Sequence, residues 1–193
     1  MKIMRAAVVA LVLAGVAAGV AYGALPLTGR VLHSGELAGM KASGPVGVIT
    51  GASAWVSTAD VGLPTSGQKA DVARLRKLGF IAGVDENLVT AGNQNRGGLS
   101  AVEQFSSAKS AKAELVDEST ADGPWTYFSV DGIPGARGFE ALSAQGNGRN
   151  VAFTSGVYYY IVGAGWSGGS TNAVSRTTLA AVALMLYHRV HDK

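Results

Sequence analysis

Ser167 is the residue whose neighbours come nearest to a catalytic pattern. Residues 165–169 read GWSGG, a Gly-x-Ser-x-Gly in which glycines allow the sharp turn that exposes a nucleophilic serine. Such a serine needs a histidine as general base and a carboxylate that orients the histidine. After Ser167 the sequence offers His188, His191 and Asp192, all at the end of one predicted helix. One helix end can hardly supply both partners, so a small serine hydrolase stays an alternative and we name no catalytic residue.

Two other segments match parts of nucleotide-binding turns. Residues 163–168, GAGWSG, form a Gly-x-Gly-x-x-Gly between a predicted strand and a predicted helix. A dinucleotide fold also needs a second parallel strand and an acidic residue about 20 positions onward, which this sequence does not offer before Lys193. Residues 46–53, VGVITGAS, match the opening of short-chain dehydrogenases, but bulky residues at 54–56 would block the approach of a pyrophosphate. We therefore predict no cofactor.

The metal-ligating residues are few. The sequence has no cysteine and three histidines. His188 and His191 are three residues apart, so they could share one helix face, but a catalytic zinc needs three protein ligands. Positive charge near the C-terminus of a helix also favours histidines there without any metal. We predict no metal site.

Aromatic residues are the best candidates for binding. In an extended strand Tyr158 and Tyr160 point to one side of the sheet and Tyr159 to the other. One side must belong to the core, and an aromatic residue on the other side could anchor a partner. We therefore take Tyr159, Trp166 and Trp125 as candidate binding residues, with packing in the core or on the sheet surface as the alternative.

Residues 1–29 are predicted to be a signal peptide or a signal anchor. Lys2 and Arg5 precede AAVVALVLAGVAAGVAY, seventeen uncharged residues at 6–22. The uncharged stretch continues to Leu27, which is long enough to span a bilayer, since about 20 apolar residues suffice. The positive residues lie only on its N-terminal side, so the remainder of the chain is expected to be exported. If the segment is not removed, the membrane itself is a partner.

The sequence contains a sorting-signal look-alike and little net charge. Residues 25–29, LPLTG, match the signal that attaches some surface proteins to the cell wall, but that signal works near the C-terminus, ahead of an apolar stretch. Here the apolar stretch comes first, so we interpret the match as chance. Residues 30–193 contain 14 of the 16 basic residues and all 13 acidic ones, which leaves a net charge of +1. This balance predicts no nucleic-acid partner.

The rest of the chain divides into two parts. Residues 30–66 are rich in Gly, Ser, Ala and Pro, and we predict a tether with a possible short strand at 46–50. The periodic pattern of a globular domain begins at 67 and continues to 193. Helices are predicted from Gln68 to Gly79, after Ser106 or Ser107, and after Ser175. Strands are predicted at 80–89, 99–105, 125–130, 138–142, 150–154 and 157–162.

This order of elements predicts an α+β fold. Short turns join neighbouring strands, including Ser155-Gly156 between two of them, so the strands are expected to pair antiparallel. The helices are expected to pack on one face of the resulting sheet. The predicted fold class is therefore an antiparallel β-sheet with helices packed on it, preceded by a hydrophobic leader.

Several segments together resemble a known group of proteins. The leader, ARLRKLGFIAGV, LSAVEQFSSAKSAKAEL, FSVDGIPGARGF and NVAFTSGVYYYIVGAGW with a terminal helix resemble exported proteins of high-GC Gram-positive bacteria. Some of these are similar to PsbP-like α/β/α lipoproteins. The resemblance covers about residues 68–191 and implies an antiparallel sheet with helices and a binding or accessory role. It implies no catalytic residue, and the cysteine that carries the lipid in those lipoproteins is missing here.

The sequence therefore predicts an exported, non-catalytic binding or accessory module at the cell envelope. Its ligand or envelope partner is left open. A small serine hydrolase and a self-associating structural protein remain the alternatives.

Overall fold

The computed structural model describes residues 25–44, 47–59, 65–120, 125–142, 147–167 and 173–191. Within these residues the chain forms one antiparallel sheet of eight strands, as predicted. The order across the sheet is β1 (Lys41–Ala42), β3 (Phe80–Thr90), β4 (Asn93–Phe105), β8 (Tyr158–Trp166), β7 (Asn147–Ser155), β6 (Arg137–Leu142) and β5 (Thr126–Phe128), and β2 (Ile49–Thr50) also pairs with β3. The predicted α+β class is confirmed.

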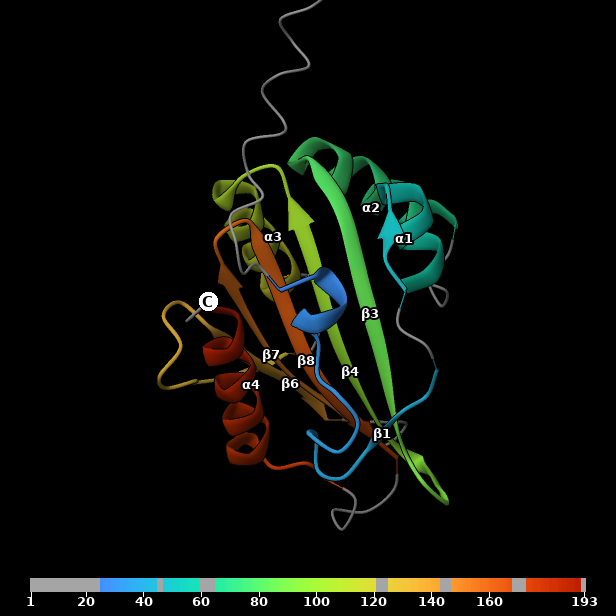
Figure 1. Ribbon diagram of the computed structural model, residues 1–193, viewed down its shortest axis with the longest axis vertical. Coiled ribbons are helices and arrows are strands. Elements are labelled where there is room, and N and C mark those ends of the chain that lie inside the picture. The colour runs from blue at the N-terminus through green and yellow to red at the C-terminus, as the bar shows by residue number, and fades with distance from the viewer. Residues whose placement is uncertain are drawn as a thin grey trace, which may run out of the picture.

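Helices lie on both faces of this sheet (Figure 1). One face carries α1 (Ala52–Ala59), α2 (Thr65–Leu78) and α3 (Ala108–Thr120), and we call it the α1–α3 face. The opposite face carries the short 3-10 helix η1 (Leu27–Arg30) and the long α4 (Arg176–His191), and we call it the α4 face. The prediction of helices on one face was wrong, because the central strands bury side chains in both directions.

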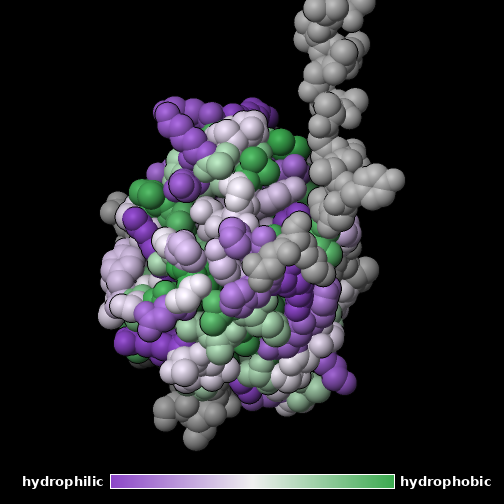
Figure 2. All heavy atoms as spheres, turned by 60° about the vertical axis from the view of Figure 1, so that its left-hand side comes forward, coloured by the Kyte–Doolittle hydropathy of each residue, from purple (hydrophilic) through white to green (hydrophobic). Residues whose placement is uncertain are grey.

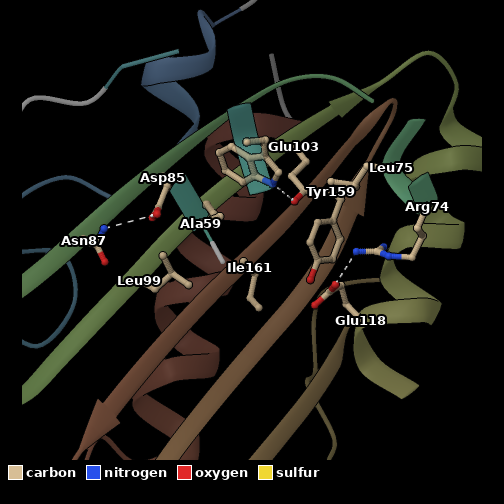
Figure 3. Close-up of a pocket in the computed structure, with 12 residues that line it drawn as sticks. Ala59, Arg74, Leu75, Asp85, Asn87, Leu99, Glu103, Glu118, Tyr159 and Ile161 are labelled. Carbon is tan, nitrogen blue, oxygen red and sulfur yellow. Dashed lines mark hydrogen bonds and ion pairs between the residues drawn. The ribbon is translucent and has the colours of Figure 1, made fainter. Parts of the chain in front are cut away.

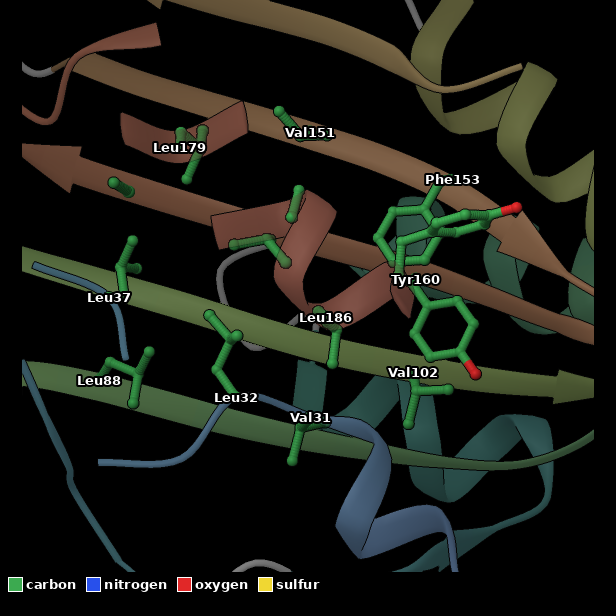
Figure 4. Packing of buried hydrophobic residues seen from close by; sticks show 14 of the residues in the cluster. Val31, Leu32, Leu37, Leu88, Val102, Val151, Phe153, Tyr160, Leu179 and Leu186 are labelled. Atoms are coloured by element: carbon green, nitrogen blue, oxygen red, sulfur yellow. The ribbon is translucent and has the colours of Figure 1, made fainter. Parts of the chain in front are cut away.

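The core of the α4 face is built on stacked aromatic rings. Phe153 and Tyr160 stack with their ring centroids 4.8 Å apart (Figure 4). Tyr187 of α4 meets Phe153 edge-on at 5.7 Å. Leu179 and Leu186 of α4 are fully buried beside them. Burying each of these large side chains contributes about 1.5–3 kcal/mol, so this layer holds α4 to the sheet.

The segment 30–66 differs from the predicted tether. Its residues Val31, Leu32, Leu37 and Met40 have 0% exposure and belong to the core of the α4 face. The same segment supplies β1, β2 and α1 to the fold. Its Gly, Ser and Ala content suggested a solvated linker, but four large apolar residues are enough to hold it against the sheet.

Arg30 holds the start of this segment. Its Nη1 donates a hydrogen bond of 3.0 Å to the hydroxyl of Tyr160, and its guanidinium lies 4.1 Å from the ring centroid of Tyr158. Burial raises the pKa of Tyr160 to about 12, although the nearby Arg30 charge acts in the opposite direction. Tyr158 and Tyr160 share the α4 face, as the alternation predicted.

The predicted helix ends at Ser107, Ser175 and Gly79 are confirmed, whereas α2 begins at Thr65, three residues before the predicted start at Gln68. The Oγ of Ser107 accepts a hydrogen bond of 3.1 Å from the Ser110 amide at the start of α3. Ser175 does the same for Thr178 at the start of α4, at 3.0 Å. Gly79 follows the last residue of α2 with a φ of 72°, a left-handed conformation that glycine adopts without strain.

Three strands are longer by three or more residues than the sequence pattern predicted. β4 begins at Asn93, β7 begins at Asn147 and β8 continues to Trp166, so glycine-rich stretches predicted as turns or connections are paired strand. Backbone groups make the ladder bonds, so a strand can pass through glycines when its neighbours fix the register. The outcome is a long glycine-rich end of the sheet.

Among the described residues, no helix is both long and apolar enough to cross a membrane. Residues 1–24 of the predicted leader lie outside the described residues. On the side of the molecule in Figure 2, hydrophobic residues are interspersed with polar ones and do not gather in one continuous patch.

Candidate functional site

A cavity of about 220 Å³ lies between the α1–α3 face of the sheet and its helices. Side chains from β3, β4 and β8 form its floor, and residues of α1, α2 and α3 form its walls (Figure 3). The apolar part includes Trp55, Leu75, Leu99 and Ile161. The polar part consists of Arg74, Asp85, Asn87, Glu103, Glu118 and Tyr159. Mixed linings of this kind are typical of small-molecule sites.

Three polar atoms of this lining have no hydrogen-bond partner among the described residues. They are Oε2 of Glu103, the hydroxyl of Tyr159 and Oδ1 of Asp85. Glu103 is 8% exposed and Tyr159 is 3% exposed, so water reaches these two side chains poorly. A buried polar atom without a partner costs about 1–3 kcal/mol, and such atoms are rare in folded proteins. Four more buried atoms of the described chain also lack a partner, namely Oγ1 of Thr90, Nε of Arg96, Oε1 of Glu114 and Nε1 of Trp125. The three atoms of the lining differ from these because they belong to one cavity.

The sheet register brings these groups together. Glu103 on β4 lies directly opposite Tyr159 on β8. Glu103 also pairs with Gly83 on β3, and Asp85 lies two residues further along that strand on the same face. Residues opposite or diagonal to each other in a ladder have Cβ atoms about 5–8 Å apart. The three unpaired atoms thus come from neighbouring positions on three adjacent strands.

Trp55 holds the second oxygen of the Glu103 carboxyl group, Oε1. Its indole nitrogen donates a hydrogen bond of 2.7 Å to Oε1 of Glu103. The indole ring lies over Gly83, where a Cβ would come within 2.6 Å of it. The glycine thus gives α1 room to place Trp55 against the sheet, and Oε2 of Glu103 remains directed to the cavity lining.

Arg74 joins α2 to the acidic side chains of α3. Its guanidinium bonds to Glu114, to Glu118 at 3.0 Å and to Asp71 at 3.4 Å. Glu114 is 1% exposed, so Arg74 supplies a charge partner that this carboxylate needs. Arg74 is the one basic residue in the cavity lining as the described residues define it, against the lining acids Asp85, Glu103 and Glu118.

Burial changes the ionisation of these groups. Desolvation raises the pKa of Glu103 well above its ordinary value, and the nearby carboxylates of Glu114 and Glu118 add to the effect. Desolvation also raises the pKa of Asp85. The pKa of Tyr159 rises well above 10 for the same reason, with the carboxylates again adding to it. A positive charge in the cavity would oppose these shifts and stabilise the ionised acids.

The structure separates the three candidate binding residues. Tyr159 lines the cavity. Trp125 contacts Phe139, edge-on at 5.3 Å, within the hydrophobic cluster of the same face. Trp166 points to the α4 face, where Arg149 lies 5.1 Å from its ring centroid. No common site contains all three in the described part of the chain.

Sequence reasoning missed Glu103, Asp85 and Arg74. The strand pattern had one usable signal, because Leu99, Ala101 and Phe105 mark the buried side of β4 and Glu103 occupies the same side. An acidic residue in phase with buried apolar ones is a buried carboxyl group, which is uncommon without a partner. Nothing in the sequence placed Arg74 beside it.

The structure does not assemble the hydrolase alternative. The hydroxyl of Ser167 donates a hydrogen bond of 3.0 Å to Oδ1 of Asn95. His191 instead lies 3.3 Å from the hydroxyl of Ser155, at the other end of β8. The nine residues of that strand span about 30 Å. Asp192 lies outside the described residues.

Comparison with known proteins shows a likeness at the level of fold. No protein-family model matches the chain, and no curated protein matches it. Among solved structures, the extracellular domain of PknH from Mycobacterium tuberculosis is similar, with a TM-score of 0.53 and 15% sequence identity. The match covers 90% of this chain and 100% of that domain. The α+β architecture is therefore shared with an extracellular domain of a high-GC Gram-positive bacterium.

Proposed function

We propose that this chain is an extracytoplasmic, non-catalytic module that binds a small ligand in the cavity of the α1–α3 face. The observation that carries the proposal is the pair Glu103 and Tyr159, two buried side chains that line a cavity. Among the described residues, Oε2 of Glu103 and the hydroxyl of Tyr159 have no hydrogen-bond partner. A ligand that bonds to both atoms offsets the cost of burying them.

Two features support the location and the absence of catalysis. The leader at 1–29 has the layout of an export signal, and the matched PknH domain is extracellular by its description. The described lining of the cavity offers no serine, cysteine or histidine, and in this proposal its acids and Tyr159 hold a ligand by hydrogen bonds. The proposed role is recognition at the cell envelope, with the membrane as a further partner if the leader is retained.

A thermal-shift screen tests the proposed function. The full-length chain is mixed with a panel of small amines, carboxylic acids, sugars and nucleosides, and the melting temperature is measured with each compound. Because a ligand that binds only the folded state stabilises it, we expect at least one compound class to raise the melting temperature.

Two variants locate the binding. The double variant Glu103→Gln with Tyr159→Phe keeps the shapes of both side chains and should lose the ligand-induced shift. Tyr158→Phe removes a phenol hydroxyl at the adjacent position on the opposite face and should keep it. A folded protein that no compound stabilises at millimolar concentration would contradict the proposal, as would a shift that survives the double variant.

A further inference from the structure

The floor of the cavity consists of rows of side chains that lie side by side on neighbouring strands. Glu103 on β4 and Tyr159 on β8 share the first row, and the second row consists of Asp85 on β3, Ala101 on β4 and Ile161 on β8. Successive rows on one face are two residues apart, which is about 7 Å along the strands. A small molecule can therefore bond to the first row and cover the second.

Negative charge exceeds positive charge around the first row. Arg74 is the basic residue of the described lining, and its guanidinium already bonds to Glu118 (Figure 3) and to Glu114. The carboxyl group of Glu103 bonds to the neutral indole of Trp55, and its Oε2 has no partner among the described residues. Within the described chain, Glu103 is thus a buried acid that lacks a cation bonded to it.

The ionisation of Glu103 agrees with this lack of a cation. Desolvation raises the pKa of Glu103 and the carboxylates of Glu114 and Glu118 raise it further, whereas the charge of Arg74 lowers it without cancelling the rise. An opposite charge within about 4–6 Å favours the ionised form of an acid. A cation beside Oε2 would therefore stabilise the carboxylate that the rest of the site destabilises.

The two unpaired atoms of the first row favour an ammonium group as this cation. An ionised carboxylate only accepts hydrogen bonds, and a tyrosine hydroxyl can accept one as well as donate. An ammonium group carries three N–H donors, so it can bond to Oε2 of Glu103 and to the hydroxyl of Tyr159 at once. Among the described residues, no group of three or more acidic, histidine or cysteine side chains is placed to hold a metal ion. The site thus fits an organic cation better than a metal.

The remainder of the cavity fits an apolar body. The second row offers the small side chain of Ala101 beside Ile161, and Leu75 and Leu99 also line the cavity. The cavity volume is about 220 Å³, and an apolar cavity of about 150 Å³ is known to hold benzene. One ring with a short chain is therefore of the right size.

We propose that the cavity binds a small organic amine, whose ammonium group bonds to Glu103 and Tyr159 and whose apolar body lies over Ala101 and Ile161. This proposal rests on the proposed binding function and adds the chemical class of the ligand. Asp85, in the second row, adds a further negative charge near the ammonium group.

Calorimetry with three compounds of matched size tests the charge of the ligand. The full-length chain is titrated with 2-phenylethylamine, 2-phenylethanol and 3-phenylpropanoate, which carry a positive, a neutral and a negative end. Hydrogen bonds to charged groups exceed neutral ones by enough to give about tenfold in affinity, so the amine should bind about tenfold more tightly than the alcohol. The carboxylate should bind more weakly than both.

Two substitutions test whether Glu103 is the source of this preference. Glu103→Gln keeps the acceptor for Trp55 and removes the charge, so the amine and the alcohol should bind about equally to this variant. Asp117→Asn is the matched control, because it removes one negative charge from an exposed position of α3 outside the cavity lining. It should keep the tenfold preference for the amine.

The apolar body is tested without any substitution. Ethylamine carries the same ammonium group as 2-phenylethylamine but lacks the ring. Because burying a ring of this size contributes about 1.5–3 kcal/mol, ethylamine should bind at least about tenfold more weakly. Equal affinities of the two amines would overturn the apolar half of the proposal.

A substitution in the second row tests where the ring lies. Ala101→Val adds two methyl groups to the floor of the cavity and should weaken binding of 2-phenylethylamine by about fivefold or more through overpacking. Ala141→Val makes the same change at a half-buried position of β6 outside the lining and should leave the affinity unchanged. Unchanged affinity in a folded Ala101→Val variant would overturn the placement over Ala101.

The outcomes separate this proposal from the proposed function. Equal binding of the amine and the alcohol, or no binding of the amine, overturns the amine ligand. A compound of another class, whose thermal shift is lost in the double variant of Glu103 and Tyr159, would then still support a binding module.

Discussion

At the level of single residues, the proposed ligand site depends on Glu103 and Tyr159. They face each other across β4 and β8, and each has one polar atom without a partner among the described residues. Ordered water can fill such places when a cavity is polar and has room. The mixed apolar and acidic lining favours an organic ligand over water alone.

Replacing Glu103 by Gln should reveal its raised pKa as a pH-dependent gain in stability. Because the folded-state pKa lies above the unfolded value of about 4.3, the folded protein holds the proton more tightly, and stability falls as pH rises between the two values. Glu103→Gln avoids this loss and keeps the acceptor for Trp55. Its melting temperature should exceed that of the unmodified chain at pH 8 and match it at pH 4. An equal difference at both pH values would contradict the assignment.

Glu140 is the matched control, because its pKa is shifted in the opposite direction to that of Glu103. Hydrogen bonding to Arg176, together with Arg149, lowers the pKa of Glu140. Its contribution is present above the unfolded pKa and is lost as pH falls through the folded value. Glu140→Gln should therefore lower the melting temperature at pH 8, and the difference should shrink toward pH 3.

Arg74 should be required for stability because of Glu114. Arg74→Met removes the partner of a carboxylate that is almost fully buried, and breaking such a pair costs about 3 kcal/mol. Arg76→Met is the control, since Arg76 bonds to Ser53 at the surface and should change the free energy of unfolding by less than about 0.5 kcal/mol. Urea unfolding of both variants measures this, and equal effects would refute the role of Arg74.

At the level of elements, the segment before α1 is the main surprise. We expect Leu32→Ala to lower the free energy of unfolding by about 3 kcal/mol, because Leu32 is fully buried beneath the α4 face. Lys41→Ala, an exposed position of β1, should change it by less than about 0.5 kcal/mol. If denaturant unfolding gave small effects for both, the segment would behave as the tether that its composition suggested.

The sequence predicted the helices and most strands because their signals are local. Ser107, Ser175 and Gly79 mark helix ends through hydrogen bonds and backbone geometry within a few residues. Alternation along a strand is less reliable than these helix signals, as the start of β3 shows. A bulge between Phe80 and Ala82 turns Phe80 to the α1–α3 face, where it meets Trp55 at 5.8 Å.

The candidate site was harder to predict because it depends on pairing between distant strands. Tyr159 was named from the alternation of one strand, and the structure places it in the cavity lining. Its neighbours Glu103 and Asp85 come from strands more than fifty residues earlier in the chain. Trp166 was named as an aromatic residue beyond the end of the predicted strand, and its even position in β8 turns it to the α4 face. Which side of a strand holds a site cannot be read from alternation alone.

For the whole molecule, residues 1–29 should direct export. Fused to an alkaline phosphatase that is active only outside the cytoplasm, they should give activity in a bacterial host. The double change Leu11→Arg with Leu13→Arg interrupts the apolar stretch and should abolish that activity, because charged residues at the centre of such a segment oppose insertion. An active fusion protein confined to the cytosol, or full activity in the double variant, would contradict the proposed location.

The sheet with helices on both faces gives the molecule two separate interiors. The α4 face is filled mainly by stacked aromatic and aliphatic side chains, although Glu86 and Glu140 are also buried there. The α1–α3 face combines a hydrophobic cluster with a cavity whose lining includes the buried Glu103 and Tyr159. We infer that the first layer stabilises the fold and the second one binds.

A crystal structure of the full-length chain with a compound that raises its melting temperature tests the central claim most directly. We expect polar atoms of the compound within about 3 Å of Oε2 of Glu103 and the hydroxyl of Tyr159, the distance of a hydrogen bond. A cavity filled only by ordered water at these two atoms, with the compound elsewhere or absent, would contradict the account.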